Sequence, residues 1–174
     1  MNTKSLSTSV YWLSTVLMVG VPIALMATTL LFIFNGEDVL GSFSKHNIVD
    51  TPPAWAMVGV LALIILKSAI YFGLFREMRR LFALFIKSQA LSASSAQSLH
   101  RIGLYLLAMT LFGMLSYSAL SLLLSSGNPV GQRTLSVELT ANNIELLVAA
   151  GLMILMGRAM TEAARSAEEN KAFI

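Results

Sequence analysis

The feature that most constrains this chain is a run of 25 residues without a charge, from Val10 to Phe34. As an α-helix with a rise of 1.5 Å per residue, this run would be about 37 Å long. That length crosses the ~30 Å hydrocarbon core of a bilayer with some tilt. The run is about twice as long as the apolar core of a secretory signal peptide, and Lys4 is the only charge before it. It therefore predicts an uncleaved first membrane span.

Three more apolar stretches predict four spans in all. They run over residues 54–73, 102–124 and 144–157. Of the 174 residues, 56% are hydrophobic and only 12% are charged, and the mean hydropathy is +0.72, whereas a typical soluble domain has about 25% charged residues. Spanning helices satisfy their own backbone polar groups inside lipid. Residues 1–174 are therefore predicted to form one all-α domain, a four-transmembrane-helix bundle.

The Lys and Arg residues of the loops predict the orientation of the spans. One side carries Lys4, Arg76, Arg79, Arg80, Lys87, Arg101, Arg158, Arg165 and Lys171. The other side carries only Lys45 and Arg133. Because positive residues accumulate in cytoplasmic loops, both termini are expected in the cytoplasm.

The two loops on the sparsely charged side are expected to form a small cap outside the membrane. In the second loop, Leu135, Val137 and Leu139 alternate with polar residues, which predicts a short β-strand over residues 133–140. A lone strand is not stable in water, so its partner is expected to be residues 39–43 of the first loop or a neighbouring subunit. Arg133 and Glu138 either pair with each other in solvent, which is the simpler interpretation, or bind a ligand.

The inner segment 74–101 is amphipathic and basic. Its apolar side chains share one helical face, formed by Leu74, Met78, Leu81, Phe82 and Phe85. We expect span two to continue into the cytoplasm and then to lie along the inner leaflet, where each basic residue gains about 1 kcal/mol from anionic lipid. The candidate docking residues for a protein partner or a lipid headgroup are Arg76, Arg79, Arg80 and Lys87. The simpler alternative is that they only set the topology.

The tail, residues 158–174, is expected to be a cytoplasmic helix that continues span four. Arg158, Glu162 and Arg165 lie on one face with alternating sign, and we count them among the docking candidates. Another face carries small residues, including Ala159 and Ala163, which would let the basic inner helix approach closely. A soluble extension of span four is the simpler interpretation.

Lys67 and Glu145 are the charges closest to the membrane interior. A charge inside a span usually faces the protein interior or a watery cavity. Lys67 lies about six residues, or ~9 Å, from the inner end of its span, so snorkelling to the headgroups is the simpler interpretation. Glu145 follows Asn142 at capping-box spacing, and Gln97 follows Ser94 in the same way, which predicts two helix N-termini.

No constellation of residues points to catalysis, so the protein is predicted not to be an enzyme. The chain has no cysteine, which excludes a disulfide and a Cys-based metal site. His46 and His100 are expected on opposite sides of the membrane and so cannot share a metal. No common hydrolase, nucleotide or dinucleotide motif occurs, and no cofactor is expected. Direct nucleic-acid binding is not expected either, because the basic segment is short and faces the membrane.

Four stretches carry a family resemblance: 74–82, 100–103, 131–136 and 158–170. Together they resemble the bacterial four-span membrane proteins of domain-of-unknown-function family 2975. The resemblance covers most of the chain, most clearly from about Leu74 onward. It implies a bacterial inner-membrane location but no activity. Members are often encoded beside a small helix-turn-helix regulator, which implies a membrane component of a regulatory pair. The family's Pro-Glu-Asn-type turn before the third span is replaced here by residues 94–97.

Two functions are therefore open. The leading one is a non-enzymatic inner-membrane protein that acts through protein partners, as a sensor, accessory subunit or regulatory subunit. The alternative is a homo-oligomeric ion channel or small-solute transporter with its path between protomers. In that case Lys67 would favour anions, and Glu138 or Glu145 would lie at the outer mouth.

Overall fold

Four α-helices make up the fold in the computed structural model, which describes residues 3–34, 52–87, 89, 92–129 and 131–171. The helices are α1 (Thr3–Phe34), α3 (Ala54–Ile86), α4 (Ala93–Ser125) and α5 (Ala141–Lys171). All four are long and apolar enough to span a membrane, so the predicted all-α, four-span fold is confirmed. Each helix has 31 to 33 residues, or about 47–50 Å, and so extends beyond the ~30 Å hydrocarbon core.

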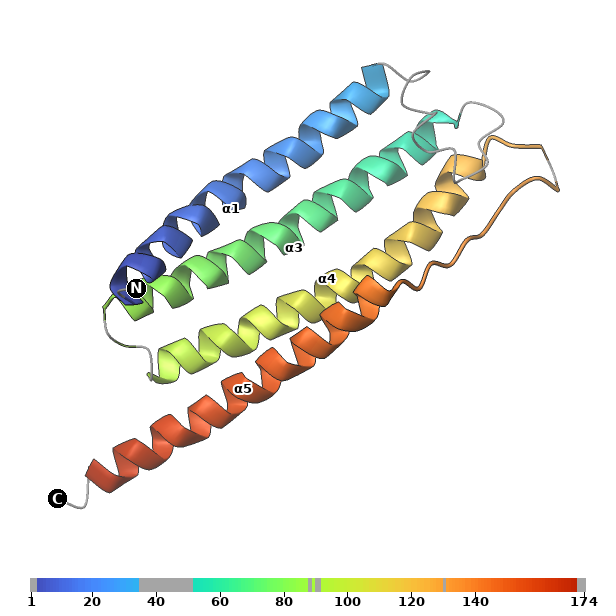
Figure 1. Ribbon diagram of the computed structural model, residues 1–174. Coiled ribbons are helices and arrows are strands. Elements are labelled where there is room, and N and C mark those ends of the chain that lie inside the picture. The colour runs from blue at the N-terminus through green and yellow to red at the C-terminus, as the bar shows by residue number, and fades with distance from the viewer. Residues whose placement is uncertain (1–2, 35–51, 88, 90–91, 130, 172–174) are drawn as a thin grey trace.

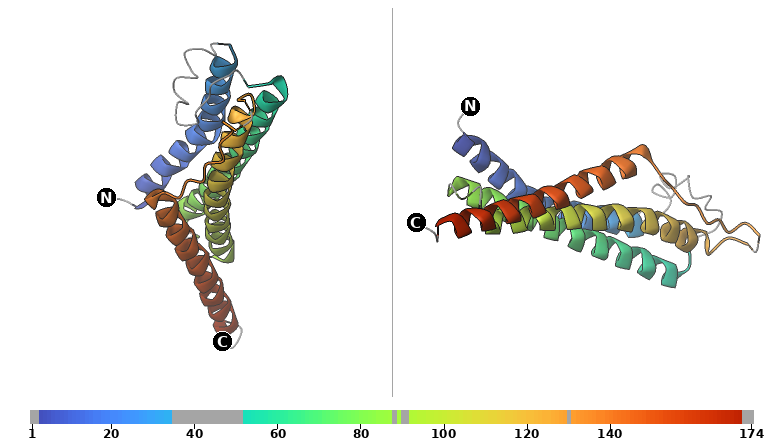
Figure 2. Two further views of the ribbon diagram at one scale, coloured as in Figure 1. Left: turned by 90° about the vertical axis from the view of Figure 1, so that its right-hand side faces the viewer. Right: turned by 90° about the horizontal axis from the view of Figure 1, so that it is seen from below.

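The helices lie side by side in the order α1, α3, α4, α5, each antiparallel to the next (Figure 1). Within the described residues, contacts join α1 to α3, α3 to α4 and α4 to α5, and no other pair of helices. The bundle is therefore open, and Figure 2 shows from two further sides that the row does not close into a ring. Each outer helix packs on a single neighbour.

The two ends of this row differ in charge. At one end lie the start of α1, the end of α3, the start of α4 and the end of α5 (Figure 1). We call it the basic end because it carries Arg76, Arg79, Arg80, Lys87, Arg101, Arg158 and Arg165. We call the opposite end, where α4 leads into the second predicted loop, the loop end. The first predicted loop, residues 35–51, lies outside the described residues.

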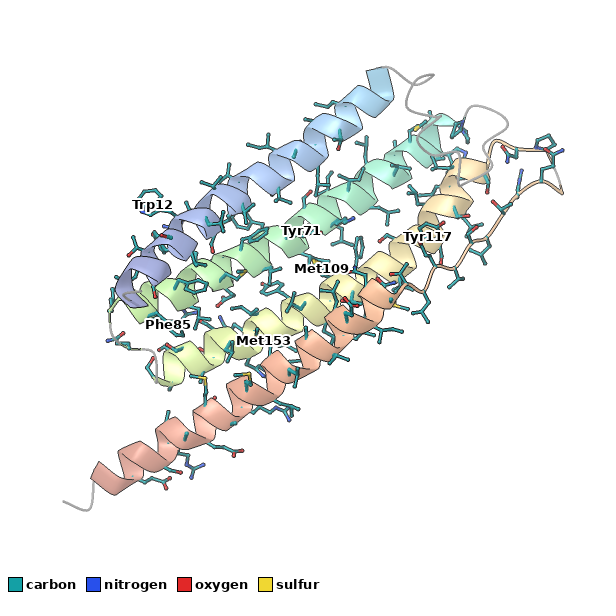
Figure 3. The ribbon with its side chains drawn as sticks, in the orientation of Figure 1. Trp12, Tyr71, Phe85, Met109, Tyr117 and Met153 are labelled. Atoms are coloured by element: carbon teal, nitrogen blue, oxygen red, sulfur yellow. The ribbon has the colours of Figure 1, made fainter. Side chains whose placement is uncertain are left out.

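Two apolar clusters hold α3 against α4. Near the loop end, Val60 packs on Leu124, and both are buried. Near the basic end, buried Leu74 and Leu81 of α3 pack with Ile102 of α4 and with partly buried neighbours. Figure 3 labels two of these neighbours, Phe85 and Met109. The predicted apolar face of segment 74–85 is thus the face that contacts α4.

Segment 74–101 is not a separate helix along the membrane surface. α3 runs without a break from Ala54 to Ile86, and α4 begins at Ala93, so the segment comprises the end of one helix, a short connection and the start of the next. The second apolar cluster explains the difference, since it keeps α3 packed on α4 as far as its last turn. The N-cap of α4 is Ser92, whose Oγ accepts a hydrogen bond from the backbone N of Ser95 at 3.2 Å, so the predicted cap at Ser94 is wrong.

α4 and α5 approach most closely at two glycines. A Cβ at Gly103 would lie 2.8 Å from the backbone N of Ile154 and 3.0 Å from the carbonyl O of Ala150. A Cβ at Gly157 would lie 2.6 Å from the backbone N of His100. Small residues let helix backbones approach in this way inside membranes.

The tail of α5 does not pack on the end of α3. The two helices make no contact within the described residues, and Ala159 and Ala163 are exposed. The predicted approach of this small-residue face to the basic inner helix is therefore wrong. The small residues that bring α5 close to a neighbour lie nearer the middle of the helix, and that neighbour is α4.

Residues 132–140 form an extended segment and not the predicted β-strand. α5 begins well short of the loop end of α4 (Figure 1), and this segment lies beside the part of α4 that α5 leaves uncovered. The backbone N of Thr134 donates to Ser125 Oγ at 3.2 Å, and the backbone N of Ser136 donates to Ser121 Oγ at 3.1 Å. Both hydroxyls also donate to the carbonyl O of Thr134, at 2.9 Å from Ser121 and 3.2 Å from Ser125.

The alternation of residues in this segment has a different cause from the one predicted. Thr134 and Ser136 face α4 and are half-buried, whereas Leu135, Val137 and Leu139 are 63%, 74% and 62% exposed. The polar edge therefore pairs with hydroxyls of a helix and not with a second strand. The predicted partner segment 39–43 lies outside the described residues.

Candidate functional sites

Two arginines at the basic end are bound to other side chains of the molecule. Arg79 Nε donates to Tyr11 Oη at 3.1 Å, and its guanidinium carbon lies 5.2 Å from the centroid of the Tyr11 ring. This contact joins α3 to α1 by a hydrogen bond and a cation–π interaction. Arg165 Nε donates to Glu169 Oε1 at 2.8 Å on the exposed side of α5. Arg79 therefore has a structural role, although the sequence placed it among the docking residues.

The other docking candidates keep their charge at the surface. Arg76, Arg80, Lys87 and Arg158 are exposed, and none forms an ion pair with another described residue. The sequence predicts Arg76, Arg80 and Lys87 on the face of α3 opposite its apolar residues, but Arg76 also lines a pocket between α3 and α4. The basic end thus presents uncompensated positive charge from both α3 and α5.

A pocket of about 530 Å³ lies between the start of α4 and α5 at this end. Arg158 and Glu162, two of the predicted docking residues, line it from α5. Ser94, Gln97 and His100 line it from α4, and the ring Nδ1 of His100 lies 3.4 Å from the carbonyl O of Ile154. The pocket therefore combines both signs of charge with neutral polar groups, a composition that suits a polar segment of a partner protein.

Lys67 lines a second cavity, of about 320 Å³, between α1, α3 and α4. The wall is mostly apolar, and its polar groups include Thr28, Ser116 and Tyr117. Lys67 is the residue of α3 in this wall that lies nearest the basic end, so the cavity extends from it toward the loop end. Lys67 is half-buried at the basic-end side of this cavity.

The sequence interpretation missed Glu77. This residue is only 6% exposed, and its Oε1 accepts a hydrogen bond from Arg101 Nη1 at 3.4 Å between α3 and α4. Its Oε2 is buried and has no partner among the described residues. The signal was present, because Glu77 lies three residues after Leu74 and four before Leu81, which is the spacing of one helical face.

The polar candidates near the loop end are not brought together. Arg133, Glu138 and Glu145 are all exposed, and none of them forms an ion pair with another described residue. The N-cap of α5 is Thr140, whose Oγ1 accepts from the backbone N of Asn143 at 3.3 Å.

Capping therefore does not explain Glu145. The predicted cap at Asn142 is wrong, because Asn142 lies inside the first turn of α5. His46 lies outside the described residues. Within the part of the chain that the structure describes, no group of three His, Cys, Asp or Glu residues could hold a metal ion.

The four apolar helices and their order define a multi-pass membrane protein. No protein family, curated protein or solved structure matches this chain. The resemblance to domain-of-unknown-function family 2975 therefore stays a prediction.

Proposed function

We propose that this chain is a non-enzymatic protein of the bacterial inner membrane that acts through a protein partner, as a sensor, accessory subunit or regulatory subunit. The basic end would lie in the cytoplasm, as the positive-inside rule indicates for so many Lys and Arg residues. The observation that carries the proposal is the exposed, unpaired charge on α3 and α5 at this end, around the pocket between α4 and α5.

The docking surface comprises Arg76, Arg80, Lys87, Arg158, Glu162 and Arg165, of which Arg165 is paired with Glu169 on its own helix. Arg79 is not part of it because Tyr11 holds its guanidinium. α5 packs on α4 alone and continues past the start of α4 at the basic end (Figure 1). A change in the packing of α5 on α4 within the membrane would therefore move the charged end of α5 directly, which gives the docking surface a mechanical link to the spans.

Photocrosslinking in cells tests this proposal. A photoreactive amino acid at Lys87 or Arg158 is expected to form a crosslink to one discrete second protein. With the photoreactive amino acid at one of these two positions, reversing the charge at Arg80 and at the other position together should weaken that crosslink about tenfold or more, because the partner loses its electrostatic complement. The same amino acid at Leu115, which is 71% exposed on the apolar part of α4, is the control and should not give this product.

Two outcomes would contradict the proposal. If the charge-reversed protein inserts with inverted topology, the cations serve only as orientation signals. If the crosslinks and native mass spectrometry of gently extracted protein give only copies of this chain, the protein is a homo-oligomer without a separate partner.

A homo-oligomeric channel or small-solute transporter is the second candidate, and the cavity around Lys67 favours it. An ammonium inside the membrane selects for anions. If this candidate holds, Lys67→Met should lower anion flux into liposomes about tenfold or more. Glu145→Gln should raise it, because the change removes a negative charge at the outer mouth that repels anions. Lys87→Met, the same change at the exposed C-cap of α3, is the matched control. Flux that does not respond to Lys67→Met and Glu145→Gln argues against a channel.

A further inference from the structure

A third pocket, of about 430 Å³, lies between α3 and α4 and combines two cations with a buried carboxylate. Arg76, Glu77, Arg101 and Tyr105 supply its polar groups. Arg101 Nη1 donates a hydrogen bond to Glu77 Oε1 at 3.4 Å. Glu77 Oε2 is buried and has no donor among the described residues. A buried carboxylate oxygen is rarely left without a hydrogen bond. The pocket is therefore lined by two guanidinium donors and by a carboxylate whose buried Oε2 is without a donor among the described residues.

The depth of the pocket matches that of lipid headgroups. Arg76 is the first cation on α3 after the apolar stretch 54–73, and Arg101 directly precedes the apolar stretch 102–124 of α4. Both residues thus mark the basic-end boundary of the hydrocarbon core. From that boundary Leu104 and Ala108 continue the pocket wall into the apolar part of α4, and both are exposed. A ligand with a polar head and acyl chains would meet matching groups along this wall.

We propose that this pocket binds the headgroup of a phosphoethanolamine lipid from the leaflet at the basic end. Arg76 and Arg101 would donate hydrogen bonds to the phosphodiester oxygens, since guanidinium groups pair well with phosphate. The Glu77 carboxylate would turn toward the pocket, so that Oε2, which is buried in the free protein, accepts a hydrogen bond from the primary ammonium of the same headgroup. A choline headgroup carries the same charges but has no N–H to donate, so the carboxylate distinguishes the two. This site does not depend on the proposed protein partner.

Lipid titration of the purified protein by native mass spectrometry tests the proposal. The probes are phosphatidylethanolamine, phosphatidylcholine and phosphatidylglycerol with identical acyl chains. The wild-type protein is expected to bind phosphatidylethanolamine about tenfold more tightly than phosphatidylcholine, because only the former gives the carboxylate a charge-assisted hydrogen bond. Glu77→Gln should remove most of this preference while leaving phosphatidylcholine binding nearly unchanged.

The arginine variants separate the phosphate contact from general attraction. Arg76→Gln should weaken the binding of phosphatidylethanolamine and phosphatidylcholine by the same factor, since both lipids carry the phosphate. Arg76 is exposed, so this variant keeps the fold even if Glu77→Gln loosens the contact between α3 and α4. Arg80→Gln is the matched control, because Arg80 is also exposed on α3 but does not line the pocket, and its lipid binding should equal that of the wild type.

Four results would overturn the proposal. The wild-type protein could bind phosphatidylethanolamine and phosphatidylcholine equally, or it could prefer phosphatidylglycerol, in which case the pocket responds only to net charge. Arg80→Gln could weaken lipid binding as much as Arg76→Gln does, which would show non-specific attraction. Glycerophosphoethanolamine, the headgroup without acyl chains, could compete at the concentration of the lipid itself, and the ligand would then be a soluble molecule.

Discussion

Replacing Gly157 by alanine is expected to loosen α5 from α4 and to lower the free energy of unfolding by about 1–3 kcal/mol. The added Cβ would lie 2.6 Å from the backbone N of His100 and 2.8 Å from its Cα. Backbone atoms inside a helix cannot rotate out of the way, so the two helices must move apart. Gly103→Ala should have a similar effect, because its Cβ would lie 2.8 Å from the backbone N of Ile154.

The chain offers a matched control for this prediction. Gly151 is also in α5, but a Cβ there would meet nothing within 4 Å. Gly151→Ala should therefore leave stability unchanged or raise it by about 0.5–1 kcal/mol, since alanine favours the helix more than glycine does. The free energy of unfolding of each variant is measured in mixed micelles by raising the fraction of denaturing detergent and monitoring helicity by circular dichroism. Equal stability of Gly157→Ala and Gly151→Ala would contradict the close approach of the two helices.

The double change Ser121→Ala and Ser125→Ala is expected to release the extended segment 132–140 from α4. The two hydroxyls make four hydrogen bonds with the backbone of Thr134 and Ser136. α4 is apolar from Ile102 to Leu124, so Ser121 lies at membrane depth, where water does not readily replace a lost hydrogen bond. Amide hydrogen exchange at Thr134 and Ser136 should become about tenfold to a hundredfold faster, which corresponds to a loss of about 1.4–2.7 kcal/mol.

Ser118→Ala is the control for the double serine variant. The hydroxyl of Ser118 donates only within its own helix, to the carbonyl O of Met114 at 3.5 Å. Its removal should leave the exchange rates at Thr134 and Ser136 as they are in the wild type. If the double variant also leaves both rates unchanged, the four hydrogen bonds do not hold the segment in place.

The number and order of the spans could be predicted from the sequence because they depend on properties of single segments. Each apolar run of residues 10–34, 54–73 and 102–124 lies within one observed helix. The fourth run was a poorer guide, since residues 144–157 give about 21 Å of helix, which is less than the ~30 Å core. The observed α5 extends beyond this run at both ends, from Ala141 to Lys171.

Contacts between residues that are far apart in the chain could not be predicted from the sequence. Arg79 was indistinguishable from its basic neighbours until the fold placed Tyr11 against it, 68 positions earlier in the chain. The alternation in residues 133–140 predicted a β-strand, but the backbone of this segment bonds to two serine hydroxyls on a helix, and no strand pattern identifies those. Glu77 is different, because its spacing from Leu74 and Leu81 already places it on the apolar helical face, and it is buried there.

The open row also determines the order in which the molecule can assemble. Every contact between helices in the described chain joins two that follow one another in the sequence. Folding that depends on such sequential neighbours is fast, and chains begin to fold from the N-terminal side during synthesis. α3 can therefore dock on α1, and α4 on α3, before the ribosome has made the next helix. α5 is the last of the four to be made, so its charged end takes up its position only when the row beside it is complete.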